Sequence, residues 1–134
     1  RSWLPVCTMC SPIRSFKDLE VWQLAIELFV DVTILVRKLP TADRFVFESQ
    51  TRRAARSVAA NISQGHLRRH LGDYLRLLSY ARGSLGEAQT DLVLIGRTTS
   101  VAKDELAKCF ARADVIGRKL TRLMACLRGK QKQG

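Results

Sequence analysis

The chain has 134 residues, of which 46% are hydrophobic and 26% are charged. This length suits a single domain with its own core, and the apolar content excludes a disordered chain. The formal net charge of +11 at pH 7 favours polyanionic partners, because a cation that binds a phosphate releases counterions. No run of about 20 apolar residues is present, so we expect no membrane span.

Residues 1–14 contain two prolines and no hydrophobic periodicity, and they are predicted to be a flexible lead-in. No cleavable signal pattern or disulfide framework is visible, which predicts a cytoplasmic protein. Cys7 and Cys10 have metal-site spacing but no second pair of ligands. Cys109 and Cys126 are too far apart along one predicted helix to share a metal. Both are interpreted as small core hydrophobes.

The first helix is predicted to begin at a capping box of Ser15 and Asp18 and to end at Pro40. It carries two apolar stripes. The stripe predicted to face the core comprises Leu19, Trp22, Ile26, Phe29, Thr33 and Val36. The second comprises Val21, Leu28, Val32 and Leu35, which cannot share that direction because adjacent residues point about 100° apart. The acidic residues of this helix, including Asp31, are assigned to its polar face.

The second helix is predicted over 43–64, with Asp43 as N-cap and Gly65 as a left-handed C-cap. Its inward side chains are mostly small: Phe47, Thr51, Ala54, Ala55, Val58 and Ile62. The third helix, over 71–98, repeats apolar residues in three-four alternation at Leu71, Tyr74, Leu78, Ala81, Leu85, Ala88, Leu92 and Ile95. It also contains Gly83 and Gly86, which are predicted to pack against the alanines of the second helix, where Glu87 meets Arg53.

The fourth helix is predicted over 102–128, with Gly129 at its end and a basic tail over 129–134. Its inward stripe is Leu106, Cys109, Ala113, Ile116, Leu120, Leu123 and Leu127. Four amphipathic helices joined by short turns within residues 15–128 predict an all-α, antiparallel up-and-down four-helix bundle.

No recognisable catalytic site is present, since the usual helical metal motifs and the phosphate-binding loop are missing. His66 and His70 are four residues apart, but no neighbouring carboxylate or cysteine completes a metal site. We therefore expect no enzymatic activity, no metal and no cofactor.

Positive charge gathers in two segments. Arg52, Arg53, Arg56, Arg68 and Arg69 cluster along the sequence around the end of the second helix. A second candidate site near the C-terminus comprises Arg118, Lys119, Arg122, Arg128, Lys130 and Lys132. Arginine binds phosphate through a bidentate fork, so we expect binding to RNA or DNA backbones. No aromatic residue is interleaved with the first cluster along the sequence, so base stacking is not indicated.

Two alternatives stay open. The charge can be a solvated surface, which would leave a structural or protein-interaction module with no nucleic-acid role. The surplus apolar residues, in turn, predict an oligomer, because patches of this size are usually covered in soluble proteins. The expected subunit interface comprises Val21, Leu28, Val32, Leu35, Leu75, Leu77, Val93 and Leu94.

Three motifs carry a family resemblance. They are residues 16–23 (FKDLEVWQ), then Gln50, Arg52 to Ala55, Ser57, Val58, Asn61, Ile62 and Gly65, then Ala81, Gly83, Ser84, Leu85 and Glu87. Over residues 15–127 the chain resembles the four-helix-bundle proteins encoded in 23S ribosomal-RNA intervening sequences. The resemblance implies antiparallel bundles that assemble into homopentamers. It also implies a relation to accessory proteins of diversity-generating retroelements, which bind nucleic acid and a reverse transcriptase. Gln64 departs from the family pattern, which commonly has Glu before the glycine.

Overall fold

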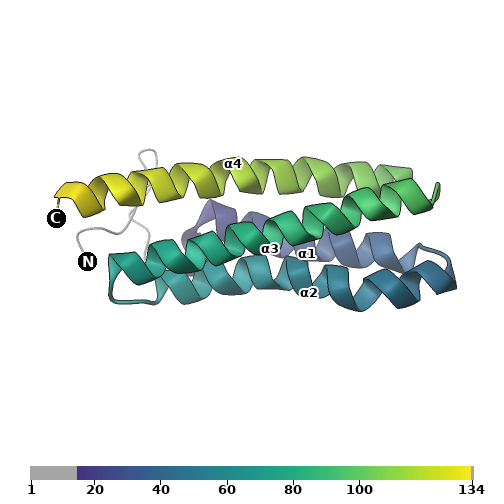
Figure 1. Cartoon of the computed structure of the whole chain (residues 1–134), viewed down its shortest axis with the longest axis horizontal. Helices are drawn as coiled ribbons and strands as arrows, with labels where there is room; N and C mark the ends of the chain where they lie inside the picture. Colours follow the sequence, from purple (N-terminus) through teal and green to yellow (C-terminus); the bar gives the residue numbers. More distant parts are fainter. Residues whose placement is uncertain (1–14, 134) are drawn as a thin grey trace.

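The computed structural model describes residues 15–133, which form helices and no strand. The elements are a short 3-10 helix, η1 (Phe16–Asp18), followed by α1 (Glu20–Arg37), α2 (Thr41–His66), α3 (Leu71–Thr98) and α4 (Lys103–Gln133). α1 and α3 each lie against both α2 and α4, so the four long helices surround one core. Their short connections lie at alternating ends of the assembly, as Figure 1 shows.

The predicted capping box is confirmed, but it caps the N-terminus of η1 rather than that of α1. The backbone N–H of Lys17 donates to Ser15 Oγ at 3.2 Å, and the N–H of Ser15 donates to Asp18 Oδ2 at 3.1 Å. Leu19 separates η1 from α1 in extended backbone and is buried. The capping box therefore fixes how the chain enters the bundle.

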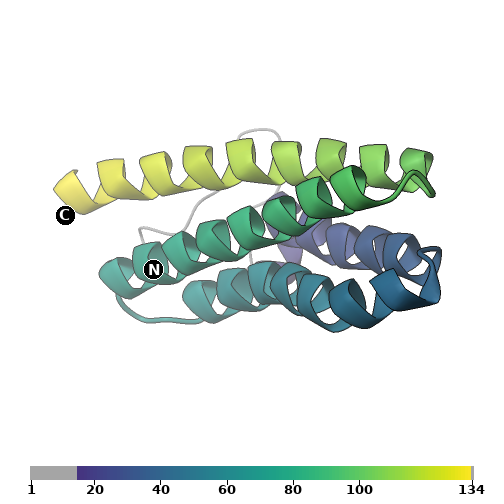
Figure 2. The same ribbon diagram turned by 45° about the vertical axis from the view of Figure 1, so that its right-hand side comes forward.

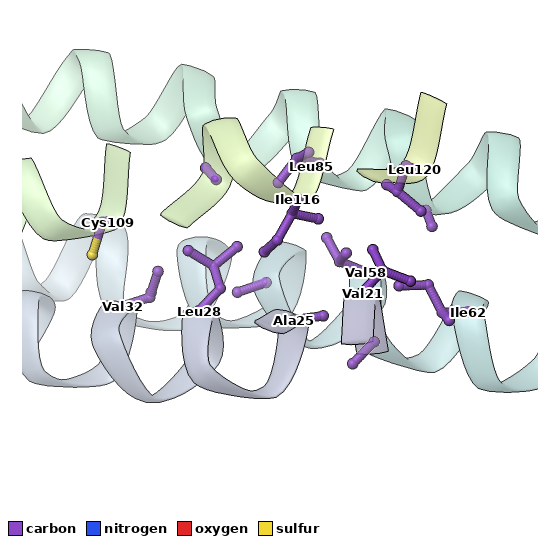
Figure 3. Close-up of a cluster of buried hydrophobic side chains, with 14 of the residues drawn as sticks. Val21, Ala25, Leu28, Val32, Val58, Ile62, Leu85, Cys109, Ile116 and Leu120 are labelled. Carbon is purple, nitrogen blue, oxygen red and sulfur yellow. The ribbon is translucent and has the colours of Figure 1, made fainter. Parts of the chain in front are cut away.

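Most of the prediction for α1 is reversed: the second stripe is buried, whereas of the stripe expected in the core Leu19 and Val36 are buried. Val21, Leu28, Val32 and Leu35 are at most 5% exposed and lie in the core. Figure 3 shows the first three there with Ala25. Ile26, expected inside, is 38% exposed, and Trp22 and Phe29 are only half-buried at the edge of the core. Both stripes repeat with the same helical period, so periodicity alone does not decide which faces inward. The choice depends on how the side chains of each stripe fit the space that the neighbouring helices leave.

The predicted subunit interface is therefore wrong for most of its residues. The four α1 residues and Leu77 are buried inside this chain, and Leu75 is half-buried against its core. Of the predicted set, Val93 and Leu94 are the exposed members.

The inner faces of α2 and α3 are as predicted, with one half-buried member, Leu71. The ends of α2 differ. Pro40 is its N-cap in place of Asp43, and Gly65 lies inside the helix without a positive φ. A Cβ on Gly65 would lie 2.8 Å from Cδ1 of Tyr74. Gly65 is thus required by the close approach of α3, and the predicted left-handed cap is wrong.

The predicted seam at Gly83 and Gly86 is also wrong. Both glycines are exposed, and a Cβ at either would meet nothing within 4 Å. α2 and α3 are instead joined by hydrogen bonds from Ser84 Oγ to Ser57 Oγ at 2.9 Å and from Thr51 Oγ1 to Asp91 Oδ2 at 3.1 Å. Arg53 and Glu87 are exposed, and no ion pair of the described residues joins them.

α4 continues through Gly129 to Gln133, so most of the predicted basic tail is helical. Its C-terminal turns extend past the ends of α2 and α3 in both Figure 1 and Figure 2. Met124 is buried where Leu123 was expected, and Leu123 is half-buried. Cys109 is buried as predicted, whereas Cys126 is exposed. Cys7 and Cys10 lie outside the described residues. Burial, and then the nearby carboxylate of Asp31, raise the pKa of the Cys109 thiol to about 12.

Asp31 connects α1 to α4 from a buried position, which corrects its assignment to a polar face. Its side chain is 4% exposed, with Arg112 Nε at 2.8 Å and Lys108 Nζ at 3.7 Å. A buried carboxylate requires such partners because its desolvation is costly. Over the described part of the chain, no helix has the length and apolar character needed to cross a membrane.

The glycines give a test of this packing. We expect Gly65→Ala to lower the free energy of unfolding by about 1 to 3 kcal/mol, because the new methyl group meets the Tyr74 ring. Gly83→Ala and Gly86→Ala should each raise it by about 1 kcal/mol, since alanine favours a helix at open positions. Urea unfolding at one fixed protein concentration measures all three. A Gly65→Ala variant as stable as the parent would contradict the close approach of α3.

Candidate nucleic-acid interface

A groove of about 660 Å³ runs between α1 and α2 and is rich in arginine. α1 contributes Phe29, and α2 contributes Arg44, Phe45, Glu48, Ser49, Arg52, Arg53 and Arg56. The α2 residues line one groove because side chains three or four positions apart lie on the same side of a helix. We refer to these eight residues as the arginine groove.

Arg52 is held in place by α1. Its Cζ atom lies 5.1 Å from the centroid of the Phe29 ring, and its Nε donates to Thr33 Oγ1 at 3.1 Å. A guanidinium over an aromatic face is stabilised by the ring quadrupole. These contacts use Nε and the face of the guanidinium. No hydrogen bond within residues 15–133 uses its two Nη groups, which are the groups that fork onto a phosphate.

Arg53 and Arg56 are exposed, and neither belongs to an ion pair in the part of the chain that the structure describes. The single acid of the arginine groove, Glu48, is shared by two cations. Arg44 Nη2 lies 3.4 Å and Arg37 Nε lies 4.0 Å from its carboxylate oxygens. Glu48 is thereby neutralised, and the arginine groove keeps an excess of positive charge.

Two phenylalanines belong to this groove, contrary to the expectation that no aromatic side chain accompanies the arginines. Phe45 is 90% exposed. It precedes Arg52 by seven residues, which is about two turns of the same helix, so a helical-wheel projection could have found it. Phe29 comes from another helix, and no local pattern places it beneath Arg52.

The predicted five-arginine cluster is divided in the structure. Arg68 and Arg69 are exposed in the connection between α2 and α3. α2 continues for about 15 Å of helical rise from Arg56 to its end at His66, and Arg68 and Arg69 lie beyond that end. They therefore do not join the arginine groove.

The C-terminal basic residues are spread over more than one face. Arg118 and Arg122 line a second groove, of about 590 Å³, between α3 and α4 with Arg82. Arg118 pairs with Asp114 at 2.9 Å, and Lys119 reaches Glu20 of α1 at 3.1 Å. Arg128 and Lys132 are exposed, and Lys130 is half-buried, on the last turns of α4. The side of the bundle formed by α1 and α2 is opposite the side formed by α3 and α4, so the two grooves occupy different faces.

The histidines are also separated. His66 is buried against Tyr74, with His66 Nδ1 and Tyr74 Oη 3.5 Å apart, whereas His70 is exposed at the start of α3. Burial raises the pKa of the Tyr74 hydroxyl. Within residues 15–133, no cluster of three or more histidine, cysteine or acidic residues is arranged to hold a metal.

Comparison with known proteins identifies the fold and the family. The profile of the 23S rRNA-intervening sequence proteins matches residues 17–122. A solved structure of a protein of unknown function from the S23 ribosomal protein family of Bacteroides thetaiotaomicron superposes with a TM-score of 0.71 at 22% identity. The match covers 78% of this chain and 97% of that protein. None of the curated proteins matches the sequence.

Proposed function

This chain belongs to the 23S rRNA-intervening sequence protein family, and we propose that it is a non-enzymatic protein that binds RNA or DNA through the phosphate backbone. The observation that carries the proposal is the arginine groove, where Arg53 and Arg56 are exposed and form no ion pair within residues 15–133, and Arg52 is fixed by Phe29. Phosphates recognised in this way are bound without regard to base sequence.

The chain's overall charge supports the same function. An excess of 11 positive charges attracts a polyanion over a distance of about 10 Å at ordinary ionic strength. We propose further that the protein works in the cytoplasm without metal or cofactor. Its family resemblance suggests that it assists another nucleic-acid-handling protein such as a reverse transcriptase.

The test replaces Arg53 and Arg56 with glutamine together. We expect affinity to fall to a similar extent for unrelated nucleic-acid sequences, because backbone contacts carry no sequence information. The plot of log affinity against log salt should also become less steep by about 1.4 to 1.8, the contribution of two lost phosphate contacts. Fluorescence anisotropy across a salt series measures both quantities. Arg52 is spared because it also contacts Phe29 and Thr33.

The matched control is Arg68→Gln with Arg69→Gln, which removes the same charge from exposed arginines outside the groove. It should weaken binding much less. If the control weakens binding as much as the test variant, charge alone determines affinity. If the parent protein binds neither RNA nor DNA at low salt, the nucleic-acid function is wrong. A structural or protein-interaction module is then the better description.

We also propose that the helices form an antiparallel up-and-down bundle that assembles into a homopentamer. The outer face of α1 exposes Ile26, Val30 and Ile34, each between 38% and 44%. The outer face of α3 exposes Val93 and Leu94. A cyclic ring joins one face of each subunit to a different face of the next. These two faces, on helices that lie across the bundle from each other, suit such an interface.

Assembly is tested with Val30→Glu and Ile34→Glu in one variant. Both side chains are exposed in the single chain, so helical content should persist while the assembly dissociates, because unpaired charge would be buried at the contact. Light scattering and circular dichroism report the two effects. Leu28→Glu is the contrasting variant and should unfold, since Leu28 is completely buried. A parent mass near 15.1 kDa would show a monomer and exclude the ring.

A further inference from the structure

Phe45 is the most exposed of the large hydrophobic side chains in the described chain, at 90%. A single exposed apolar residue is common and requires no explanation. This one, however, lines the arginine groove, so an apolar ring and several guanidiniums face the same space. An aromatic ring beside arginines matches the two chemical parts of a nucleotide, a flat base and a phosphate.

The spacing along α2 fits a short length of nucleic acid. Phe45 and Arg56 are separated by about 16 Å of helical rise, with Arg52 and Arg53 between them. With a phosphate about every 3.4 Å along one strand of a duplex, and more in an extended strand, this length spans about three to five nucleotides. A mononucleotide is too short to place its base on Phe45 and reach Arg56 with its phosphate.

A duplex uses only part of this arrangement. Its phosphates can contact the arginines, but its bases are stacked on one another and offer no free face to Phe45. In a single strand every base has an accessible π-face, and aromatic platforms bind such faces with little regard to sequence. The ring of Phe45 therefore discriminates between strand forms that the arginines alone would not distinguish.

Arg52 adds preorganisation to the same surface. Its contacts with Phe29 and Thr33 fix the guanidinium before any ligand arrives. A side chain that is already ordered loses less conformational entropy on binding. Phe29 and Thr33 act in this way as positioning residues, because they act through Arg52.

A second copy of the chain is a poorer occupant of this groove. A copy that covered Phe45 with its own groove would bring two sets of arginines together, because Arg52, Arg53 and Arg56 line the same space. Like charges at short range repel. Charge complementarity selects a polyanion instead.

We infer that the arginine groove binds single-stranded nucleic acid, with one base stacked on Phe45 and neighbouring phosphates on Arg52, Arg53 and Arg56. This inference rests on the proposed nucleic-acid function and specifies its ligand as a single strand of RNA or DNA.

The test compares a labelled 12-nucleotide single strand with the duplex of the same sequence. The probe variant is Phe45→Leu, which keeps an apolar side chain and removes the ring. We expect its affinity for the single strand to fall about 5- to 150-fold, the effect of losing one stacked base, and its affinity for the duplex to change far less. Phe110→Leu is the matched control, since Phe110 is a surface phenylalanine of α4 outside the groove, and it should bind as the parent does.

An abasic strand isolates the stacking interaction. Removing the bases should weaken binding to the parent and have little further effect on Phe45→Leu, because the two changes remove the same contact. Equal losses for single strand and duplex, or no loss for either, would overturn the inference while leaving backbone binding intact. Failure of the parent to bind either form at low salt would overturn the proposed function as well.

Two further outcomes would also contradict the inference. If Phe45→Leu lowers the mass measured by light scattering, Phe45 packs between copies of the chain. If mononucleotides compete with the 12-nucleotide strand at comparable concentrations, the groove is a site for free nucleotides. Because Phe45 is exposed, we expect the variant to keep its fold, and an unchanged urea midpoint verifies this.

Discussion

The small side chains on the inner face of α2 are the constraint on which the rest of the bundle depends. Ala54, Ala55 and Ala59 are buried there, and Gly65 lies against the ring of Tyr74. The distance between packed helices is set by the side chains at their contact, so small residues bring α2 close to its neighbours. The fully buried ring of Tyr74 fits this contact because Gly65 has no side chain. α1, in contrast, places Val21, Leu28, Val32 and Leu35 in the core and leaves Trp22 and Phe29 at its edge.

The position of Phe29 links core packing to the surface that we assign to binding. A phenylalanine buried in the core could not lie beneath Arg52, and Arg52 would then be a mobile surface side chain like most arginines. At the edge of the core, the same ring packs on apolar neighbours and also supports a guanidinium. The shape of the arginine groove therefore follows from which stripe of α1 faces the core.

The sequence predicts the buried face of a helix best where the pattern on that helix alone determines it. The seam of α3 and its bounds, 71–98, follow from a strict repeat on a single helix, and the structure confirms them. The inward stripe of α1 could not be predicted in this way, because both stripes have the same period. Packing against the neighbouring helices determines which stripe is buried. Asp31 was misassigned for a similar reason, since its partner Arg112 lies 81 residues away. The arginine cluster was divided because proximity in sequence ignores where α2 ends.

α1 contributes to two surfaces, and their separation bears on how binding and assembly combine. Phe29 forms part of the arginine groove, whereas Ile26, Val30 and Ile34 are exposed on the outer face of the same helix. Phe29 and Val30 are adjacent and so point about 100° apart, which lets a neighbouring subunit cover one without covering the other. A ring built on the outer faces would then present one arginine groove per subunit. Several weak grooves that contact one long strand act at high effective concentration, so total affinity rises without any new contact.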